Sequence, residues 1–371
     1  MLKYLYINLC ANLIEYLFRT NFMKNLENRI NLFAELGELF RDIHSNNLTS
    51  KYAEWIKVFN ESILLSHQHN KWFTIESYKE SLLNLGNELE RQNLIKWLSE
   101  YEIKEKSSKK TVAIIMAGNI PLVGFHDFLS VSILNFNTIL KLSSDDKFIF
   151  PQIINFLDNI SSGFKKKIKL TGKKIINFDA VIATGGDNSN KYFEFYFKDY
   201  PKILRKNRHS LAVLNGLESP NDLKSLGDDI FNYFGLGCRN VSKVFIPHGY
   251  DLDKLFGALY EFKDVINHNK YVNNYDYNKA VYLMNEEKFL DNGFLILKED
   301  KSLGSPIGCI FYEYYDELRD IIDYTERNQQ NIQCIVSNGL VANSIKFGQS
   351  QKPKLNNYAD NIDTINFLLK I

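Results

Sequence analysis

The sequence lacks the patterns typical of metal-binding, disulfide-bonded or nucleic-acid-binding proteins. Lys and Arg number 45 against 44 Asp and Glu, so no excess of one charge is present to hold a nucleic acid or an anionic membrane. No HExxH or EF-hand pattern occurs and the seven histidines do not cluster with carboxylates, so we expect no metal site. Cysteines are few and show no CxxC spacing; they are Cys10, Cys238, Cys309 and Cys334. We interpret them as free thiols in a reducing, cytoplasmic compartment.

The first 22 residues also lack an uninterrupted apolar run. Four polar side chains interrupt this segment: Asn8, Asn12, Glu15 and Arg19. The interruptions exclude a membrane-spanning helix there, and the pattern of a secretory signal peptide is missing. We expect residues 1–22 to be an N-terminal extension and Met23 to be the natural start, because apolar side chains recur at near-helical spacing from Leu26 onward.

The length of 371 residues predicts two or three domains. Residues 23–110 show helical spacing, with a helix-start pattern at Thr74. From 111 to 216, short apolar runs alternate with helical stretches, which predicts an α/β fold with a parallel sheet. A second alternation over 217–345 predicts another α/β domain, and residues 346–371 remain as a C-terminal segment.

Three local assignments complete this secondary-structure prediction. The run SLAVLN, residues 210–215, is assigned to the first sheet, and the run KAVYLM, residues 279–284, is assigned as a strand of the second. The basic run from Lys165 to Lys174 is assigned as a solvated loop.

The segment FGLGCRN places a cysteine on a tight loop. Ser219 suits the N-cap and Pro220 the first turn of a helix that should end at the two glycines before Cys238. Free backbone N–H groups and the adjacent Arg239 would favour the Cys238 thiolate, as a nucleophile requires. The alternative is a small, buried, apolar cysteine.

Three strand ends carry residues suited to ligand binding. Asn119 follows the run TVAIIMA, where its amide could donate to a developing oxyanion, although Asn before Ile-Pro also forms ordinary turns. Lys141 ends the run NTILKL and precedes a helix-opening cluster. Thr184 is followed by two glycines, which would let phosphate oxygens approach the backbone. The GxGxxG fingerprint is absent, and a plain turn explains each of the last two sites equally well.

In order along the chain, four runs resemble a known enzyme family: MAGNIPLVGFHDFL, ILKLSSDDK, ATGGDNSN and FGLGCRNVSKVFIP. The family is that of acyl-CoA reductases related to the reductase subunit of bacterial luminescence systems, within the aldehyde-dehydrogenase superfamily. The resemblance covers residues 23–371. It implies an aldehyde-dehydrogenase-like α/β fold, with a Rossmann-like cofactor-binding domain at 111–216 and a catalytic α/β domain at 217–345. The segment 346–371 would return to the cofactor domain or form an oligomer interface.

The resemblance also implies roles for individual residues. Cys238 takes the position of the nucleophile, and Asn119 that of the oxyanion-binding amide. The positions that would contact the cofactor are Lys141, Ser143, Ser144, Thr184, Gly185 and Gly186. Ser144 stands where many NAD-dependent relatives carry a Glu that binds the ribose hydroxyls, which makes room for a 2′-phosphate and implies NADPH. Asp145 and Asp146 weigh against that preference.

The chain departs from the superfamily pattern at three places. Arg205 lies near the position of the Glu that activates the deacylating water, so no water-activating base is evident. KSLGSPIG replaces the EEIFGP motif, and Leu236 replaces the usual Gln before the nucleophile. An acyl-enzyme on Cys238 should therefore persist until hydride reduces it.

The expected function is NADPH-dependent reduction of a long-chain fatty acyl-CoA, or of another acyl thioester delivered by an acyl-donor protein, to the aldehyde. His126 could shuttle a proton, with a helix-capping or solvated role as the alternative. Arg239 could bias the thiolate or meet a CoA phosphate, with a surface salt bridge as the alternative. The basic run at 165–174 could touch CoA phosphates or an acyl-donating partner. Relatives associate through their C-terminal segments, which suggests a homo-oligomer.

Two other functions are compatible with the same residues. The first is an acyl transferase or thioesterase that forms the Cys238 acyl-enzyme and passes the acyl group to another acceptor. The second is a non-catalytic subunit on an aldehyde-dehydrogenase scaffold, suggested by the missing cofactor glutamate.

Overall fold

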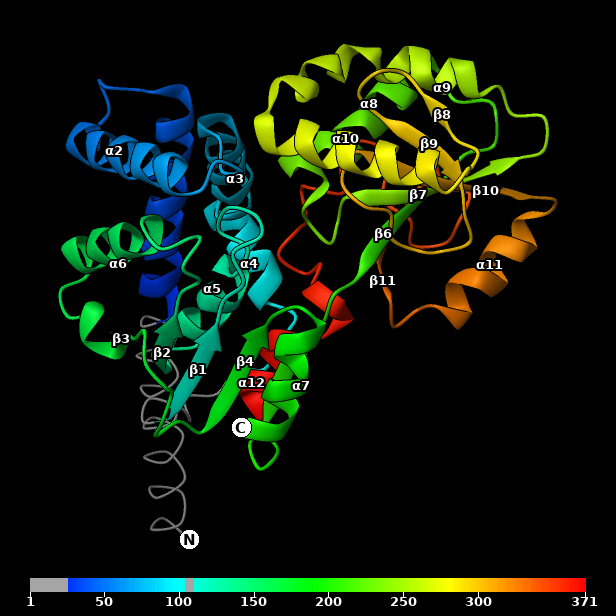
Figure 1. The fold of residues 1–371 in the computed structure, drawn as a ribbon. Helices are drawn as coiled ribbons and strands as arrows, with labels where there is room; N and C mark the ends of the chain where they lie inside the picture. The colour runs from blue at the N-terminus through cyan, green and yellow to red at the C-terminus, as the bar shows by residue number, and fades with distance from the viewer. Residues whose placement is uncertain (1–25, 104–109) are drawn as a thin grey trace, which may run out of the picture.

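The computed structural model describes residues 26–103 and 110–371, which form two α/β lobes (Figure 1). The first lobe contains the N-terminal helices and a five-stranded sheet, and the second lobe contains a six-stranded sheet. Cys10, the expected extension at 1–22 and the expected start at Met23 lie outside the described residues.

Within residues 26–103, four helices precede the first strand and pack together by their apolar sides. They span residues 26–45, α2 (Ala53–His69), α3 (Ile75–Glu88) and α4 (Arg91–Leu98). Phe33, Leu36 and Phe40 recur at helical spacing on the first helix and are fully buried. The helix start predicted at Thr74 is confirmed, because its Oγ1 accepts a hydrogen bond from the backbone N–H of Ser77 at 3.0 Å.

The first sheet has five parallel strands in the order β3-β2-β1-β4-β5. The strands are β1 (Thr111–Ile115), β2 (Asn137–Lys141), β3 (Ile168–Leu170), β4 (Ala180–Thr184) and β5 (Lys202–Arg205). Because β1 pairs with both β2 and β4, the strand order reverses there, and the carboxyl ends of these three strands meet at one edge. This is the predicted Rossmann-like arrangement.

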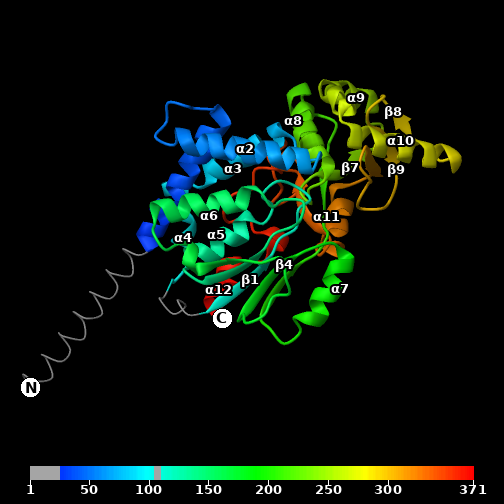
Figure 2. The ribbon, with the colours of Figure 1, turned by 60° about the vertical axis from the view of Figure 1, so that its left-hand side comes forward.

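Helices cover both faces of the first sheet. They are α5 (Phe125–Ile133), α6 (Ile149–Ile160) and α7 (Asp187–Tyr196), with a 3₁₀ turn η1 (Lys165–Lys167) before β3. Val112 and Ile114 of β1 pack into the core shared with α5, α6 and the N-terminal helices, whereas Ala113 packs on the other face with Val181 and Phe197. Figure 2 shows α7 on the side of the sheet opposite α5 and α6.

The second sheet has the order β11-β6-β7-β10-β9-β8, with only the edge strand β8 antiparallel. The strands are β6 (His209–Val213), β7 (Val241–Pro247), β8 (Leu290–Asp291), β9 (Ile296–Glu299), β10 (Cys309–Tyr315) and β11 (Ile332–Val336). Helices of one face are α8 (Pro220–Phe231), α9 (Leu252–Leu259), η3 (Tyr260–Asn267) and α10 (Asn269–Met284). On the other face, α11 (Leu318–Arg327) buries Ile321 against Phe245.

The structure corrects three sequence-based assignments. The run at 210–215 belongs to the second sheet, because β6 pairs with β7 and β11, so the chain crosses between the sheets before the boundary predicted at 216. The run at 279–284 is the last part of α10 rather than a strand, and its Tyr282 is buried together with Tyr271 and Tyr275 of the same helix. The first six residues of the basic run form η1 and the edge strand β3 rather than a loop, whereas residues 171–174 are a loop and most of the run is exposed, as predicted.

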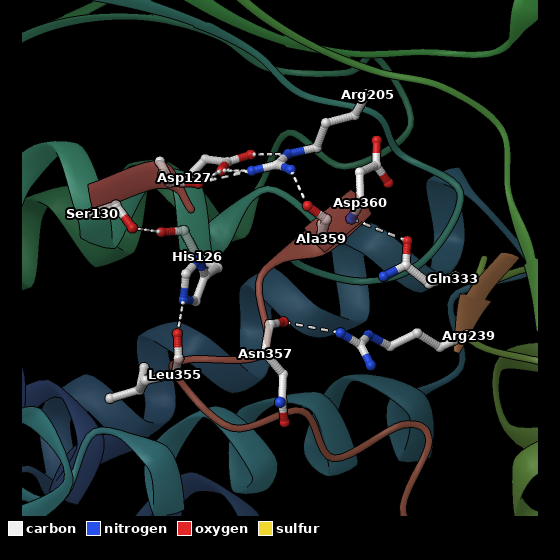
Figure 3. Close-up of polar contacts among 11 residues, drawn as sticks. His126, Asp127, Ser130, Arg205, Arg239, Gln333, Leu355, Asn357, Ala359 and Asp360 are labelled. Atoms are coloured by element: carbon white, nitrogen blue, oxygen red, sulfur yellow. Dashed lines mark hydrogen bonds and ion pairs between the residues drawn. The ribbon is translucent and has the colours of Figure 1, made fainter. Parts of the chain in front are cut away.

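The C-terminal segment runs back from the second sheet to the first lobe, where it ends in η4 (Ala359–Asn361) and α12 (Thr364–Lys370). Ile365 and Leu368 of α12 lie in the core that also contains α5. Figure 3 shows the polar contacts that hold this segment. Arg205, at the end of β5, donates two hydrogen bonds to the Asp127 carboxylate, at 2.6 and 3.1 Å, and one to the Ala359 carbonyl at 2.6 Å. Both side chains of this ion pair are buried.

The Arg205–Asp127 pair predicts a large loss of stability when one partner is neutralised. Asp127→Asn removes the carboxylate that is hydrogen-bonded to the buried Arg205 guanidinium, which should lower the free energy of unfolding by about 3–5 kcal/mol in urea titrations. Glu194→Gln, which removes the exposed pair between Glu194 and Lys206, serves as the control and should leave the urea midpoint unchanged. Equal effects of the two variants would contradict the assigned role of the buried pair.

Candidate active site

The loop that carries Cys238 follows the end of α8 in a strained conformation. The helix begins as predicted, with Ser219 as N-cap, Pro220 in the first turn and a capping box to Asp222. After it ends, Tyr233 and Phe234 adopt φ values of 54° and 58°, and Gly235 follows at 78°. Left-handed backbone costs non-glycine residues about 1 kcal/mol or more each, so surrounding contacts must hold this turn.

Asn240 supplies most of those contacts and was missed by the sequence analysis. Its side-chain N–H groups donate to the carbonyls of residues 229, 230 and 232 at 2.7–3.2 Å, and its Oδ1 accepts from the Gly237 N–H at 2.8 Å. The side chain thus caps the end of α8 and fixes the residue before Cys238. The signal in the sequence was an amide placed directly before an apolar strand and just after a glycine-rich turn.

The loop after β1 lies against the Cys238 loop from the other lobe. Asn119 Nδ2 donates to the Leu236 carbonyl at 2.9 Å. Gly237 also lies against Ile120, since a Cβ on Gly237 would meet the Ile120 side chain at 3.6–3.7 Å. The structure therefore brings the two lobes together at the two motifs that the sequence analysis singled out. The second N–H of the Asn119 amide is not used in this bond and is available to a ligand.

The electrostatics of Cys238 differ from the sequence-based expectation. Burial raises the pKa of the Cys238 thiol to about 11, and the opposing effect of Arg239 is smaller. Arg239 does lower the pKa of this thiol, as the sequence suggests, but desolvation outweighs it and the net shift disfavours the thiolate in the free protein. A positive neighbour in the sequence did not reveal that desolvation would dominate.

A second cysteine lies near the Cys238 loop. The Ser210 hydroxyl of β6 donates to the Cys238 carbonyl at 2.9 Å and lies 3.1 Å from the Cys334 sulfur on β11. Burial raises the pKa of Cys334 as well, again against the effect of Arg239. Both thiols are free, so an assignment of the nucleophile has to distinguish between them.

Two auxiliary candidates have structural partners in the C-terminal segment (Figure 3). Arg239 donates to the Asn357 carbonyl at 2.9 Å and, among the described residues, does not make the salt bridge considered for it. His126 Nε2 bonds to the Leu355 carbonyl at 2.8 Å, and the ring packs against Trp97 and Tyr358. Burial lowers the pKa of His126, which favours the neutral ring, and its Nε2 is engaged by the C-terminal segment.

The predicted cofactor residues gather at the carboxyl edge of the first sheet. Lys141 ends β2, where its carbonyl accepts from the Met116 N–H at 3.0 Å, and the Ser143 side chain lies against Gly118, which has no room for a Cβ. Thr184 ends β4, and Gly186 is the N-cap of α7 with no side-chain hydrogen bond and open space where its Cβ would be. An uncapped helix N-terminus with open space beside it fits a phosphate group.

The two acidic residues after Ser144 have different environments. Asp146 is buried and accepts hydrogen bonds from the Tyr78 hydroxyl at 2.8 Å and the Leu122 N–H at 2.7 Å. Burial raises the pKa of Asp146 to about 6. Its carboxylate thus fixes the turn after Asn119 and is committed there, whereas Asp145 is exposed.

Arg205 and Asp360 surround the place where a deacylating base was sought. Arg205 is held by Asp127 and the C-terminal segment, so it cannot act as a base. Asp360 was not singled out by the sequence analysis; its carboxylate lies 3.3 Å from Arg208 Nε, and its charge acts on the Cys238 thiol. Burial raises the pKa of the Asp360 carboxyl, although the charges of Arg208 and Arg205 oppose this shift.

The loop that replaces the EEIFGP motif is fixed from two sides. Buried Lys243 of β7 bonds to the Glu313 carboxylate at 2.6 Å and to the carbonyls of Asp300 and Ser302 at 3.1 and 3.3 Å. Gly304 lies so close to the His209 ring that any Cβ there would overlap it. The loop thus sits beside the start of β6, where the chain passes between the sheets.

The part of the chain that the structure describes contains neither a metal-binding cluster nor a membrane-spanning helix. No group of three or more His, Cys, Asp or Glu side chains in them is arranged to hold a metal ion. No helix within 26–103 or 110–371 combines the length and apolar character needed to cross a bilayer.

Sequence comparisons match this chain to reductases of acyl thioesters. The "Long-chain acyl-protein thioester reductase" of Aliivibrio fischeri is 23% identical over 348 residues, which cover 82% of this chain and 70% of that protein. The "Long-chain acyl-protein thioester reductase 2" of Photobacterium leiognathi is 24% identical over 298 residues, covering 72% of this chain and 61% of that protein. No family model matches the chain. The predicted resemblance is confirmed at this low level of identity.

Comparisons of structures identify the fold. Aldehyde dehydrogenase 21 from Physcomitrella patens, solved with the reaction product succinate, superposes with a TM-score of 0.62 at 8% identity and covers 91% of this chain and 84% of its own. The Mycobacterium tuberculosis aldehyde dehydrogenase complexed with NAD+ gives 0.58 at 11% identity, covering 84% of this chain and 72% of its own. The predicted aldehyde-dehydrogenase-like fold is confirmed.

The hydrogen bonds of Asn240 predict that this amide stabilises the loop. Asn240→Ala leaves several buried backbone groups without partners and should lower the free energy of unfolding by about 2–4 kcal/mol in chemical denaturation. Asn221→Ala changes an exposed amide in the first turn of the same helix and should have no measurable effect. A tolerated Asn240→Ala would show that the strained turn is held by other contacts.

The raised pKa of Cys238 predicts how its alkylation depends on pH. Because the thiolate reacts with iodoacetamide, the rate at Cys238 in the free protein should rise roughly tenfold per pH unit from 7 to 10, without the plateau of an ordinary cysteine. Peptide-resolved mass spectrometry measures this rate, with urea-unfolded protein as the reference. Arg239→Gln should slow the reaction further, since Arg239 lowers the pKa of this thiol. A plateau at or below pH 8 would contradict the assigned environment.

Proposed function

We propose that this chain, which has the aldehyde-dehydrogenase fold and distant homologues named long-chain acyl-protein thioester reductases, reduces a long-chain acyl thioester to the aldehyde through Cys238. One observation carries the proposal. The amide of Asn119 is bonded to Leu236, two residues before the thiol, so the oxyanion donor and the nucleophile expected from the resemblance come from different lobes to one place.

A pyridine nucleotide is the proposed cofactor. The M. tuberculosis relative is a complex with NAD+, and the residues present here suit such a group. Gly185 and Gly186 at the N-terminus of α7 would hold phosphate, and Lys141 and Ser144 at the end of β2 would bind the adenosine ribose. When bound in its reduced form, the nucleotide supplies hydride.

The first proposed step is transfer of the acyl group to Cys238. The sulfur attacks the thioester carbonyl, the donor's carbon–sulfur bond breaks, and the thiol proton ends on the departing donor thiol. The second N–H of the Asn119 amide and backbone N–H groups of the Cys238 loop would stabilise the tetrahedral oxyanion. Because the pKa of the Cys238 thiol is raised, loss of its proton is part of the cost of this step.

The second proposed step is reduction of the acyl-enzyme, which has to compete with its hydrolysis by water. In this step the acyl carbon would gain a hydride supplied by the reduced nucleotide, the Cys238 carbon–sulfur bond breaks, the aldehyde leaves, and the sulfur takes a new proton from solvent. Hydrolysis would require a base to activate water, and the side chain near that position is Arg205, paired with Asp127. The nearby carboxylate of Asp360 is paired with Arg208. The guanidinium of Arg205, in place of a carboxylate, favours reduction over release of the free acid.

The acyl donor is proposed to be a protein-bound acyl group. The names of both relatives specify acyl-protein thioesters, so a carrier protein or acyl-enzyme partner is favoured over free acyl-CoA. Acyl-CoA carries the same thioester and is the practical substrate for assay. The expected environment is a reducing cytoplasm, in which the three described thiols stay free.

A pair of cysteine variants tests the nucleophile. Cys238→Ala should reduce acyl-CoA-dependent oxidation of NADPH, followed by absorbance, by more than about a thousandfold. Cys334→Ala removes the neighbouring thiol and should keep activity within a few-fold of the wild type. The reverse pattern would assign the acyl group to Cys334.

The products of the same assay distinguish the alternatives. CoA release with free fatty acid and without NADPH oxidation would indicate a thioesterase, and transfer to an added acceptor would indicate an acyl transferase. Absence of both CoA release and calorimetric cofactor binding would indicate a non-catalytic subunit.

In this proposal, Ser144 determines the preference for NADPH over NADH. Ser144→Glu places a carboxylate where it repels a 2′-phosphate and can bind ribose hydroxyls, so the ratio of kcat/KM for NADPH over NADH should fall by at least about tenfold. Ser144→Ala is the matched control and should keep the preference for NADPH. An unchanged ratio in Ser144→Glu would place the 2′-phosphate elsewhere.

A further inference from the structure

A cavity of about 330 Å³ lies in the first lobe, away from the Cys238 loop. Three segments line it: the helix at 26–45, the turn between α5 and β2, and the loop from α6 to β3. Its polar lining residues include Arg29, Ser132, Asn135, Ser162 and Lys167. The last of these belongs to the basic run that the proposed function leaves unexplained.

The position of this cavity separates it from the cofactor residues. Asn135 comes just before β2, and Lys167 comes just before β3, so both lie at the amino ends of strands in the first sheet. Lys141 and Thr184 lie at the carboxyl ends. A five-residue strand is roughly 16 Å long, so one ligand group cannot contact both edges.

Two positive side chains are fixed around the cavity. Arg29 is half-buried, and its Nε donates to the Ile133 carbonyl at 2.6 Å. Lys167 is half-buried and bonds through Nζ to the side-chain oxygen of Asn135. Burial, together with the charge of Arg29, lowers the pKa of Lys167. No carboxylate among the described residues lies within ion-pair distance of Lys167 Nζ, and the Arg29 charge acts unfavourably on the charged form of Lys167.

An unpartnered donor completes the lining. The Ser132 side chain is only 6% exposed, and within the described chain its hydroxyl has no hydrogen-bond partner. A buried hydroxyl without a partner costs free energy comparable to a lost hydrogen bond, which an acceptor atom in the cavity would recover. The nearby acid Asp158 is occupied by the backbone N–H groups of Gly163 and Lys165.

We propose that this cavity binds a phosphate group, held by Arg29, Lys167 and the Ser132 hydroxyl. A phosphate has enough acceptor oxygens for two cations and a hydroxyl, and its negative charge removes the repulsion between Arg29 and Lys167. The volume leaves room for a small organic group attached to the phosphate. The site is therefore a second anion site, separate from the one proposed for the cofactor.

Calorimetric titration of the full chain with inorganic phosphate, at constant ionic strength, tests the site. Wild type should bind one phosphate saturably, and Lys167→Gln and Ser132→Ala should each weaken binding, the former by at least about tenfold. Lys166→Gln is the matched control, because Lys166 is an exposed neighbour in the same turn. It should bind phosphate within about twofold of wild type.

Two outcomes would overturn the proposal. The first is that wild type shows no saturable binding of phosphate. The second is that Lys166→Gln and Lys167→Gln weaken phosphate binding equally, which would show diffuse attraction to the basic run. Competition by adenosine 3′,5′-bisphosphate identifies the source of the phosphate as a nucleotide such as that of CoA. Its failure to compete identifies a smaller phosphate. Each variant counts as folded if its circular dichroism spectrum matches that of wild type.

Discussion

The hydrogen bond between the Asn119 amide and the Leu236 carbonyl joins the two lobes at the thiol. Everything proposed for the chemistry depends on this contact, because neither lobe holds a complete site. The first lobe brings an amide and the carboxyl edge of a Rossmann-like sheet, and the second brings a cysteine on a turn. Asn240 on one side and Asp146 on the other hold the two loops in the conformations that let them meet.

The C-terminal segment reinforces the same interface. It passes from β11 back to α5, bonding to Arg239 through Asn357 and to Arg205 through Ala359. Arg205, at the end of β5, affects both the packing of the C-terminal segment and the proposed chemistry. It fixes the returning chain to Asp127, and the resemblance places it near the position of a deacylating base, so a packing contact and the proposed choice of reduction over hydrolysis depend on one side chain.

Much of this arrangement could be predicted from sequence because it depends on local signals. Thr74 and Ser219 mark helix starts by their hydroxyl groups, and alternating apolar runs indicate parallel strands. An apolar run does not say which sheet it joins, so β6 was assigned to the wrong one. The strand predicted at 279–284 was wrong because only six residues were considered, whereas the buried tyrosines of α10 recur at helical spacing from Tyr271.

The properties of the site were harder to predict than its residues. The sequence shows Arg239 beside Cys238 and suggests a thiolate, but the desolvation that raises the pKa comes from the surrounding fold. Asp360 and Cys334 lie more than ninety residues from Cys238 in the chain and approach it only through tertiary packing. Their influence on the thiol has no local signal.

The most direct test of the central claim is to trap the acyl group on the protein. Incubating wild type with a long-chain acyl-CoA in the absence of cofactor, followed by peptide mass spectrometry, should show one acyl group on Cys238. Adding NADPH should remove it and release an equal amount of aldehyde. An acyl group found on another residue, or lost as free fatty acid before NADPH is added, would contradict the account.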